Sequence, residues 1–231
     1  MVDAIEATAK TSSNLPQDVD DILHYIKAIN YGLERLVELS LSTRLIKEIH
    51  KILMSDARAK HFSDPVNFRS SQNWIGGTSI NSASFVPPPV EEMKRAMSDL
   101  EKFFHDERLE IIPIIKSGLA HAQFETIHPF LDGNGRTGRM LITMMLCLSR
   151  MLEYPVLFLS SYFNKYRQNY YDALNKYHNN DIVPWIEFFL DGVCTTAVEA
   201  IETAKKINML REQDLKKVHS LGKTSSKVAV D

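Results

Sequence analysis

Apolar residues recur every three or four positions along most of the chain. The first such stripe contains Ile22, Ile26, Ile29, Leu33 and Leu36. Because an α-helix turns once every 3.6 residues, this spacing places these side chains on one helical face. The N-terminal part of the chain is therefore predicted to contain an amphipathic helix.

Similar patterns predict helices along the rest of the chain. They cover residues 45–53, 93–104, 111–127, 138–150, 160–178 and 184–218. Residues 140–148 are apolar on nearly every side of such a helix, which is typical of a helix buried at the centre of a domain. The chain is therefore predicted to fold as an all-α helical bundle.

Residues 68–86 interrupt this helical pattern. Gly76 and Gly77 form a turn signal, and residues that favour β-structure stand on both sides of them, among them Trp74 and Phe85. We therefore expect a small β-hairpin flap that projects from the helical body.

The length and the composition indicate one domain, predicted over residues 21–219. A chain of 231 residues buries enough surface to fold without a disulfide or a structural metal. The segments 1–20 and 220–231 are polar and are expected to be flexible.

The charge balance restricts the possible partners. The formal net charge is only −2, which argues against a general binder of nucleic acids or membrane surfaces. The longest apolar run, 140–148, is too short to span a bilayer, and no secretory signal opens the chain. Cys147 and Cys194 are expected to be buried free thiols in a reducing compartment. We therefore expect a soluble, cytoplasmic protein in which a few local cations handle any phosphate.

The segment 128–139 concentrates the candidate chemistry. It reads His-Pro-Phe-Leu-Asp-Gly-Asn-Gly-Arg-Thr-Gly-Arg and is predicted to be a loop that leads into the buried helix. Glycines before a helix N-terminus leave backbone N–H groups free to bind an anion, and Arg136 and Arg139 add positive charge. Asp132 is a hard oxygen ligand suited to Mg²⁺, and His128 can accept a proton at neutral pH. The set predicts a phosphate-transfer site.

Two alternative interpretations of this region are weaker. The spacing of the glycines at 133, 135 and 138 fits the dinucleotide fingerprint G-x-G-x-x-G, but that motif needs a preceding strand. His121, Glu125 and His128 fall on one helical face and could bind a transition metal. A histidine in such a place, here His121, more often makes structural hydrogen bonds.

Residues 128–139 match the signature of the Fic family, H-P-F-x-[D/E]-G-N-G-R-x-x-R, at every specified position. The chain resembles this family from about residue 21 to about residue 218. The resemblance implies a Fic-type helical bundle with a flap. It also implies a transferase, a nucleotidyltransferase that moves AMP from ATP to a Ser, Thr or Tyr hydroxyl of a target protein and releases pyrophosphate.

The resemblance also implies roles for individual residues. His128 would be the general base and Asp132 would hold Mg²⁺. Residues that bind ATP and its phosphates would be Gly133, Asn134, Gly135, Arg136, Thr137, Gly138, Arg139, Tyr170 and Tyr171. Flap residues that dock the target would be Trp74, Ile75, Gly76, Gly77 and Thr78. The implied partners are ATP and a target protein, with no nucleic acid and no membrane, and a homodimer is possible.

Other functions remain open at this point. The same site could transfer another phosphate-containing group, remove AMP, or only bind a ligand. Many family members carry an inhibitory Ser/Thr-x-x-x-Glu-Gly/Asn helix whose glutamate pairs with the arginine found here as Arg139. No glutamate of this chain fits that pattern, and Glu6 comes nearest to it. We therefore expect no self-inhibition from within this chain.

Overall fold

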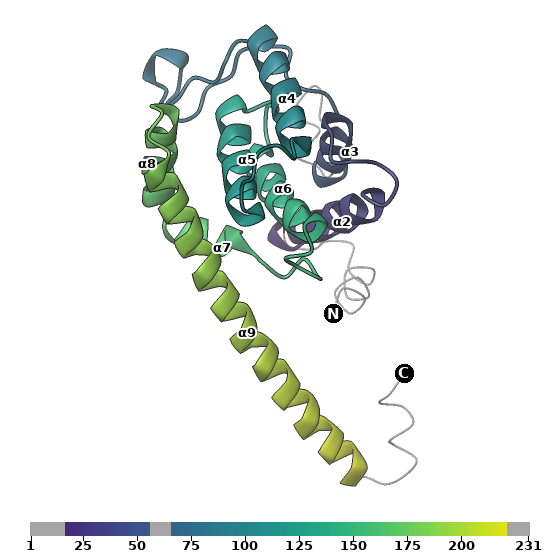
Figure 1. Ribbon diagram of the computed structural model, residues 1–231. Helices are drawn as coiled ribbons and strands as arrows, with labels where there is room; N and C mark the ends of the chain where they lie inside the picture. Colours follow the sequence, from purple (N-terminus) through teal and green to yellow (C-terminus); the bar gives the residue numbers. More distant parts are fainter. Residues whose placement is uncertain (1–16, 56–65, 221–231) are drawn as a thin grey trace.

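The computed structural model describes residues 17–55 and 66–220, and these residues form a helical bundle (Figure 1). Helices in chain order are α2 (Gln17–Arg35), α3 (Thr43–Leu53), α4 (Val90–His105), α5 (Pro113–Ile127), α6 (Asn134–Leu148), α7 (Leu159–Lys165), α8 (Arg167–His178) and α9 (Val183–Ser220). No regular strand occurs in these residues. The prediction of an all-α fold is therefore confirmed.

Local sequence explains where several helices begin. Ser42 caps α3, because its side chain accepts a hydrogen bond from the backbone N–H of Leu45. Helix α4 follows Pro89, and Pro113 is the first residue of α5. Proline suits these places because it fixes φ near the helical value and needs no acceptor for an N–H.

Two hydrophobic clusters meet at the central pair α5 and α6. One cluster packs α2, α3 and α4 against this pair and includes Leu45, Met97 and Phe124. The other packs α7, α8 and α9 against it and includes Trp185 and Phe189. The predicted central helix is confirmed, because its apolar side chains contribute to both clusters.

The flap contains less regular structure than the sequence predicts. Ile75 and Phe85 form a single antiparallel bridge, in which the N–H of Ile75 donates to the carbonyl of Phe85 at 2.9 Å. Gly76 and Gly77 then turn with positive φ, and a short 3-10 helix, η2 (Ile80–Ser82), forms the tip. Figure 1 shows the flap above α8, away from the body that contains α2 and α3.

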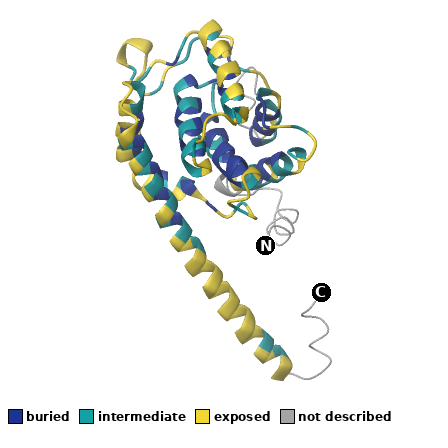
Figure 2. Ribbon diagram, viewed as in Figure 1, coloured by how far each residue is buried: buried dark blue, intermediate teal, exposed yellow. Residues whose placement is uncertain are grey.

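Helix α9 extends well beyond the bundle. Its buried residues are Trp185, Phe189, Gly192 and Thr196, all in its first half. After Thr196 no residue of the helix is buried, and Figure 2 shows this part as an exposed rod. Among the described residues, no helix combines the length and apolarity needed to cross a bilayer.

Several predicted boundaries differ from those observed. The helix predicted over 160–178 is divided at Tyr166 into α7 and α8. The predicted flexible ends, 1–20 and 220–231, lie outside the described residues except for 17–20 and 220, which are helical. Both thiols are free, but Cys147 is only partly buried and Cys194 is exposed, because it points away from the bundle on α9. The prediction of two buried thiols is therefore wrong.

Candidate active site

His128 occupies the C-terminal end of α5 in an unusual backbone conformation. Its φ and ψ are 47° and 61°, in the left-handed region, and its N–H donates to the carbonyl of Phe124 at 2.9 Å. Non-glycine residues rarely adopt a positive φ, and those that do are often at functional sites. The guanidinium of Arg69 donates from Nε to the carbonyl of His128 at 3.0 Å. This hydrogen bond holds the carbonyl of His128 in place.

Buried side chains contact the loop after His128 on the side that faces the core. Asn134 accepts a hydrogen bond from the N–H of Phe130 and donates one to its carbonyl, at 2.9 and 2.8 Å. His50 stacks on the Phe130 ring with centroids 3.5 Å apart and donates to the carbonyl of Asp132 at 2.9 Å. Phe130 itself is buried in the core. The loop is therefore fixed by contacts on the side facing the core.

Helix α6 begins at Asn134, so the second half of the motif is its first turn and not the loop that the sequence predicts. Gly133 precedes the helix with φ 77°, and a Cβ there would lie 2.9 Å from the sulfur of Met54. The first N–H groups of a helix have no acceptor within it. The guanidinium of Arg139 lies close to this helix start, because one of its nitrogens is 3.1 Å from the position that a Cβ of Gly135 would take. Free N–H groups and a cation thus lie together, an arrangement that can bind an anion.

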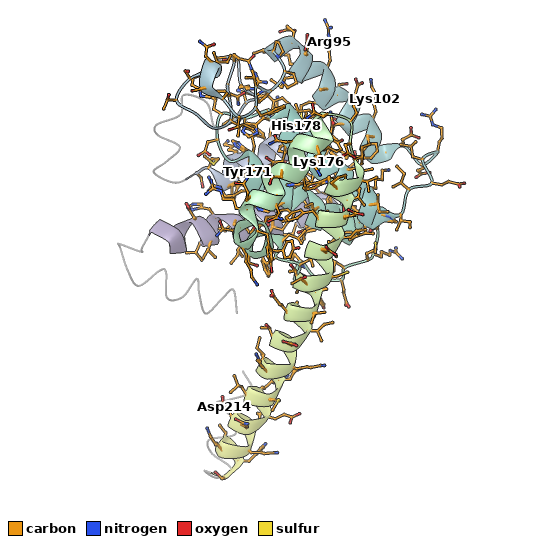
Figure 3. The ribbon with its side chains drawn as sticks, turned by 90° about the vertical axis from the view of Figure 1, so that its left-hand side faces the viewer. Arg95, Lys102, Tyr171, Lys176, His178 and Asp214 are labelled. Carbon is orange, nitrogen blue, oxygen red and sulfur yellow. The ribbon has the colours of Figure 1, made fainter. Side chains whose placement is uncertain are left out.

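A cavity of about 470 Å³ opens between the motif, the flap and α8. Its lining includes many of the residues predicted from the sequence: Ile75, Gly76, His128, Gly135, Arg139, Tyr170 and Tyr171. Figure 3 shows Tyr171 and His178 on α8. The fold therefore brings together three segments that are distant in sequence.

Some predicted site residues do not line this cavity. Trp74, Gly77 and Thr78 lie elsewhere on the flap, and the side chain of Thr137 is fully buried. A Cβ at Gly138 would meet Glu125 and His121, so this glycine faces the core.

The remaining motif residues lie beside the cavity. The side chain of Asn134 is hydrogen-bonded to the backbone of Phe130, so only the backbone N–H of Asn134 remains for an anion. Arg136 lies beside Asp132, with Nη2 and Oδ2 3.8 Å apart, and its Nη1 is 3.8 Å from Asp21 of α2. Gly133 and Asp132 precede the helix.

Sequence reasoning did not assign a role to several residues that shape the site. Arg69 is buried and donates to the carbonyls of Ser71, Pro88 and His128, so it ties both ends of the flap to the active-site loop. His178 stacks on Phe85 with centroids 3.8 Å apart. An isolated histidine or arginine carries no positional signal in a sequence, so these contacts could not be found there.

Burial controls the protonation of the groups around His128. Burial is the main reason that the pKa of His128 is lowered to about 4; the backbone carbonyl of Glu125 and the charge of Asp132 oppose this shift, and the charge of Arg69 adds to it. Burial also raises the pKa of Glu125 to about 7, although the positive charge of Arg139 opposes this. His128 is therefore neutral near pH 7 and can accept a proton.

The described residues contain no cluster of three or more His, Cys, Asp or Glu side chains that could hold a metal ion. His121, one of the three residues considered for a transition metal, is fully buried, and its Nε2 is hydrogen-bonded to the hydroxyl of Tyr170 at 3.1 Å. Its contacts are therefore those of a structural histidine. Glu6, which comes nearest to an inhibitory glutamate, lies outside the described residues.

Comparison with known proteins gives consistent matches. Residues 40–146 match the sequence model of the Fic/DOC family. A protein adenylyltransferase Fic from Drosophila erecta is 29% identical over 174 residues, which cover 74% of this chain and 30% of that protein. One from Nematostella vectensis is 29% identical over 172 residues, which cover 73% of this chain and 36% of that protein. The chain thus spans about a third of the length of these relatives.

A solved structure shows the same fold. The crystal structure of a Fic family protein from Desulfovibrio desulfuricans G20 superposes with a TM-score of 0.68 at 23% identity, covering 87% of this chain and 59% of the other. The shared helical fold, the match over residues 40–146 and the complete motif at 128–139 lead to one conclusion: the chain belongs to the Fic/DOC family.

Proposed function

We propose that this chain is a protein adenylyltransferase, which moves AMP from ATP to a Ser, Thr or Tyr hydroxyl of a target protein and releases pyrophosphate. The observation that carries the proposal is the shared cavity of His128, the N-terminus of α6 and Arg139. A neutral base and an anion site within one cavity are what transfer of a phosphate group to a hydroxyl requires. Relatives named protein adenylyltransferase Fic support the same activity.

In this proposal His128 accepts the proton of the target hydroxyl while the hydroxyl oxygen attacks the α-phosphorus. Backbone N–H groups of residues 134 and 135 bind phosphate oxygens, because the N–H of Gly133 already donates to Asp132. Arg139 and Arg136 neutralise the charge that develops on the leaving pyrophosphate. Arg139 is held for this role by its Nε, which donates to the hydroxyl of Ser160 at 2.8 Å. Tyr170 and Tyr171 border the part of the cavity proposed for adenine.

Asp132 fits the role of a magnesium ligand. Its Oδ1 accepts a hydrogen bond from the N–H of Gly133 at 2.6 Å, while Oδ2 has only a distant contact with Arg136. Its side chain is 41% exposed, so a carboxylate oxygen faces outward. Mg²⁺ typically binds one or two carboxylates together with substrate phosphates and water. When bound, the ion would supply charge neutralisation of the phosphates.

The flap is proposed to dock the target. Ile75 and Gly76 line the cavity, and Trp74, Gly77 and Thr78 continue the same exposed segment. An extended target segment can pair with such an edge through main-chain hydrogen bonds. We further propose that the protein works in the cytoplasm on protein targets and not on nucleic acids or membranes. A homodimer stays a prediction.

The experiment that tests this function is mass spectrometry after incubation with ATP and Mg²⁺. The acceptors are the protein itself and the proteins of a lysate. We expect an added AMP mass on an acceptor, and radioactive label on it when the donor is [α-³²P]ATP. The label should disappear when Mg²⁺ is chelated. An added phosphate mass, or loss of AMP from a modified target, would indicate one of the other activities and contradict AMP transfer.

A further inference from the structure

A largely buried carboxyl group, that of Glu125, lines the cavity beside His128. The side chain of Glu125 is 10% exposed, and its Oε1 has no hydrogen-bond partner among the described residues. Nδ1 of His128 is likewise buried and makes no hydrogen bond of normal geometry, although the backbone carbonyl of Glu125 also acts on this ring. Buried polar atoms without partners are costly and rare in native proteins, so their presence on two neighbouring side chains calls for an explanation.

The carboxylate of Glu125 approaches the imidazole of His128 through its other oxygen. Oε2 of Glu125 lies 4.0 Å from Nδ1 of His128. The two residues are three positions apart, and the left-handed backbone of His128 ends the helix just after Glu125. Since Nδ1 is buried and the His128 side chain also lines the cavity, Nε2 is the ring nitrogen left for a substrate. Hydrogen bonds between catalytic groups are often long before substrate binds.

We propose that Glu125 is a positioning residue for His128, whose Nδ1–H it accepts as a hydrogen bond while Nε2 takes the proton of the target hydroxyl. This inference rests on the proposed adenylyltransferase function. The hydroxyl oxygen forms a bond to the α-phosphorus, and the bond from that phosphorus to the pyrophosphate oxygen breaks. The imidazolium then carries the proton until solvent removes it, and Glu125 is regenerated unchanged. A base held by a carboxylate is the arrangement found in catalytic triads.

The surroundings of Glu125 leave it able to respond to the charge of His128. The titratable and charged groups that face it are His121 on its own helix, His128 beyond the helix end, Arg139 on α6 and Tyr170 on α8. Burial raises the pKa of Glu125 to about 7, so the carboxyl group changes protonation near neutral pH. A positive charge on the His128 ring would favour its ionised form.

Other roles for this carboxyl group fit the contacts less well. A structural acid would form hydrogen bonds or an ion pair, yet Oε1 has no hydrogen-bond partner and no lysine or arginine of the described residues lies within 4.0 Å of the carboxylate oxygens. A Cβ at Gly138 would lie 2.8 Å from Oε1, so this glycine leaves room for the Glu125 side chain in its observed position. The absence of a side chain at position 138 therefore allows Glu125 to place its carboxylate next to His128.

The test compares Glu125→Gln in the full chain with a matched control, Glu199→Gln, on the exposed part of α9. The glutamine keeps the shape of the side chain but cannot carry the charge. We expect the rate of AMP transfer at saturating ATP to fall roughly 100-fold, with unchanged ATP affinity and with a rate that no longer rises through pH 7. Glu125→Asp should restore part of the rate.

The control variant should match the parent protein in every measurement. The proposal is overturned if Glu125→Gln keeps the parental rate and pH profile. It is also overturned if ATP binding and rate fall together while the rise through pH 7 persists, because that pattern indicates only a packing role.

A second measurement does not depend on activity. The ring resonances of His128 in NMR spectra should show a step near pH 7 as Glu125 loses its proton, and Glu125→Gln should remove that step. If the parent protein shows the step but does not transfer AMP, the contact between Glu125 and His128 is supported and the proposed function is contradicted. Absence of the step in the folded parent protein would overturn the inference itself.

Discussion

The active-site loop (residues 128–133) and the flap tip (residues 75–85) border the same cavity but are held differently. Buried side chains from other elements fix the loop, with Asn134 and His50 as the main supports. The tip is closed on itself by one β-bridge and contacts α8 through one ring stack, and its residues 76–82 are exposed. A base and an anion site must be preorganised for catalysis, whereas a surface that docks a protein segment can adapt to it.

The largest effect is expected from removing the base in the loop. His128→Ala should lower AMP transfer by about 10²- to 10⁴-fold, the usual contribution of a general base. ATP affinity should persist, because the proposed anion site is built from α6 and not from His128. Measured rates of labelling and calorimetric ATP binding separate the two quantities. His219→Ala, on exposed α9, is the control; labelling that survives in His128→Ala would exclude this residue as the base.

A second prediction tests the connection between the two regions. Arg69→Lys keeps the charge but cannot reach the three carbonyls on Ser71, Pro88 and His128. Because it leaves buried acceptors unpaired, it should cost about 3 kcal/mol of unfolding free energy. Urea denaturation measures this loss, and Arg95→Lys on exposed α4 is the control. A stability equal to the parent would mean that the loop does not depend on the base of the flap.

The pH dependence of stability tests the buried acid beside the loop. The pKa of Glu125 is about 7 in the folded protein and about 4.5 when exposed. The folded state therefore holds the proton more tightly, and its stability is lost as pH rises from 4.5 through 7. Glu125→Gln avoids this loss and should be more stable than the parent by up to about 3 kcal/mol above pH 7. Denaturation curves at pH 4.5 and pH 8 check this, and a difference independent of pH would contradict it.

The smallest effect is expected at the flap tip. Phe85→Ala removes the stack on His178, which is worth about 1 kcal/mol. Hydrogen exchange of the backbone amides at positions 75 and 85 should speed up by about five-fold, while exchange in the loop stays unchanged. Val86→Ala, at an exposed neighbour, is the control. Equal acceleration in tip and loop would mean that the two regions are one cooperative unit.

Periodicity was sufficient to predict the helical fold, because apolar spacing reports which helical face is buried. The segment 140–148 is an example, since its continuous apolar character predicts the central position that α6 occupies. Boundaries were less predictable. The helix α6 starts at Asn134 and not near 138, because Gly133 and the Asn134 side chain form a helix start that no apolar pattern marks.

The motif 128–139 by itself was enough to predict phosphate chemistry, since a histidine, a carboxylate, glycines and arginines in one short segment have few uses other than phosphate handling. Only the tertiary structure decided which of these groups meet in the cavity. It places Arg139 there and Arg136 beside Asp132, and it sets Glu125 beside His128. The physical reason is that side-chain direction, burial and the pKa of a buried group depend on what other elements pack against it, and a sequence does not list those neighbours.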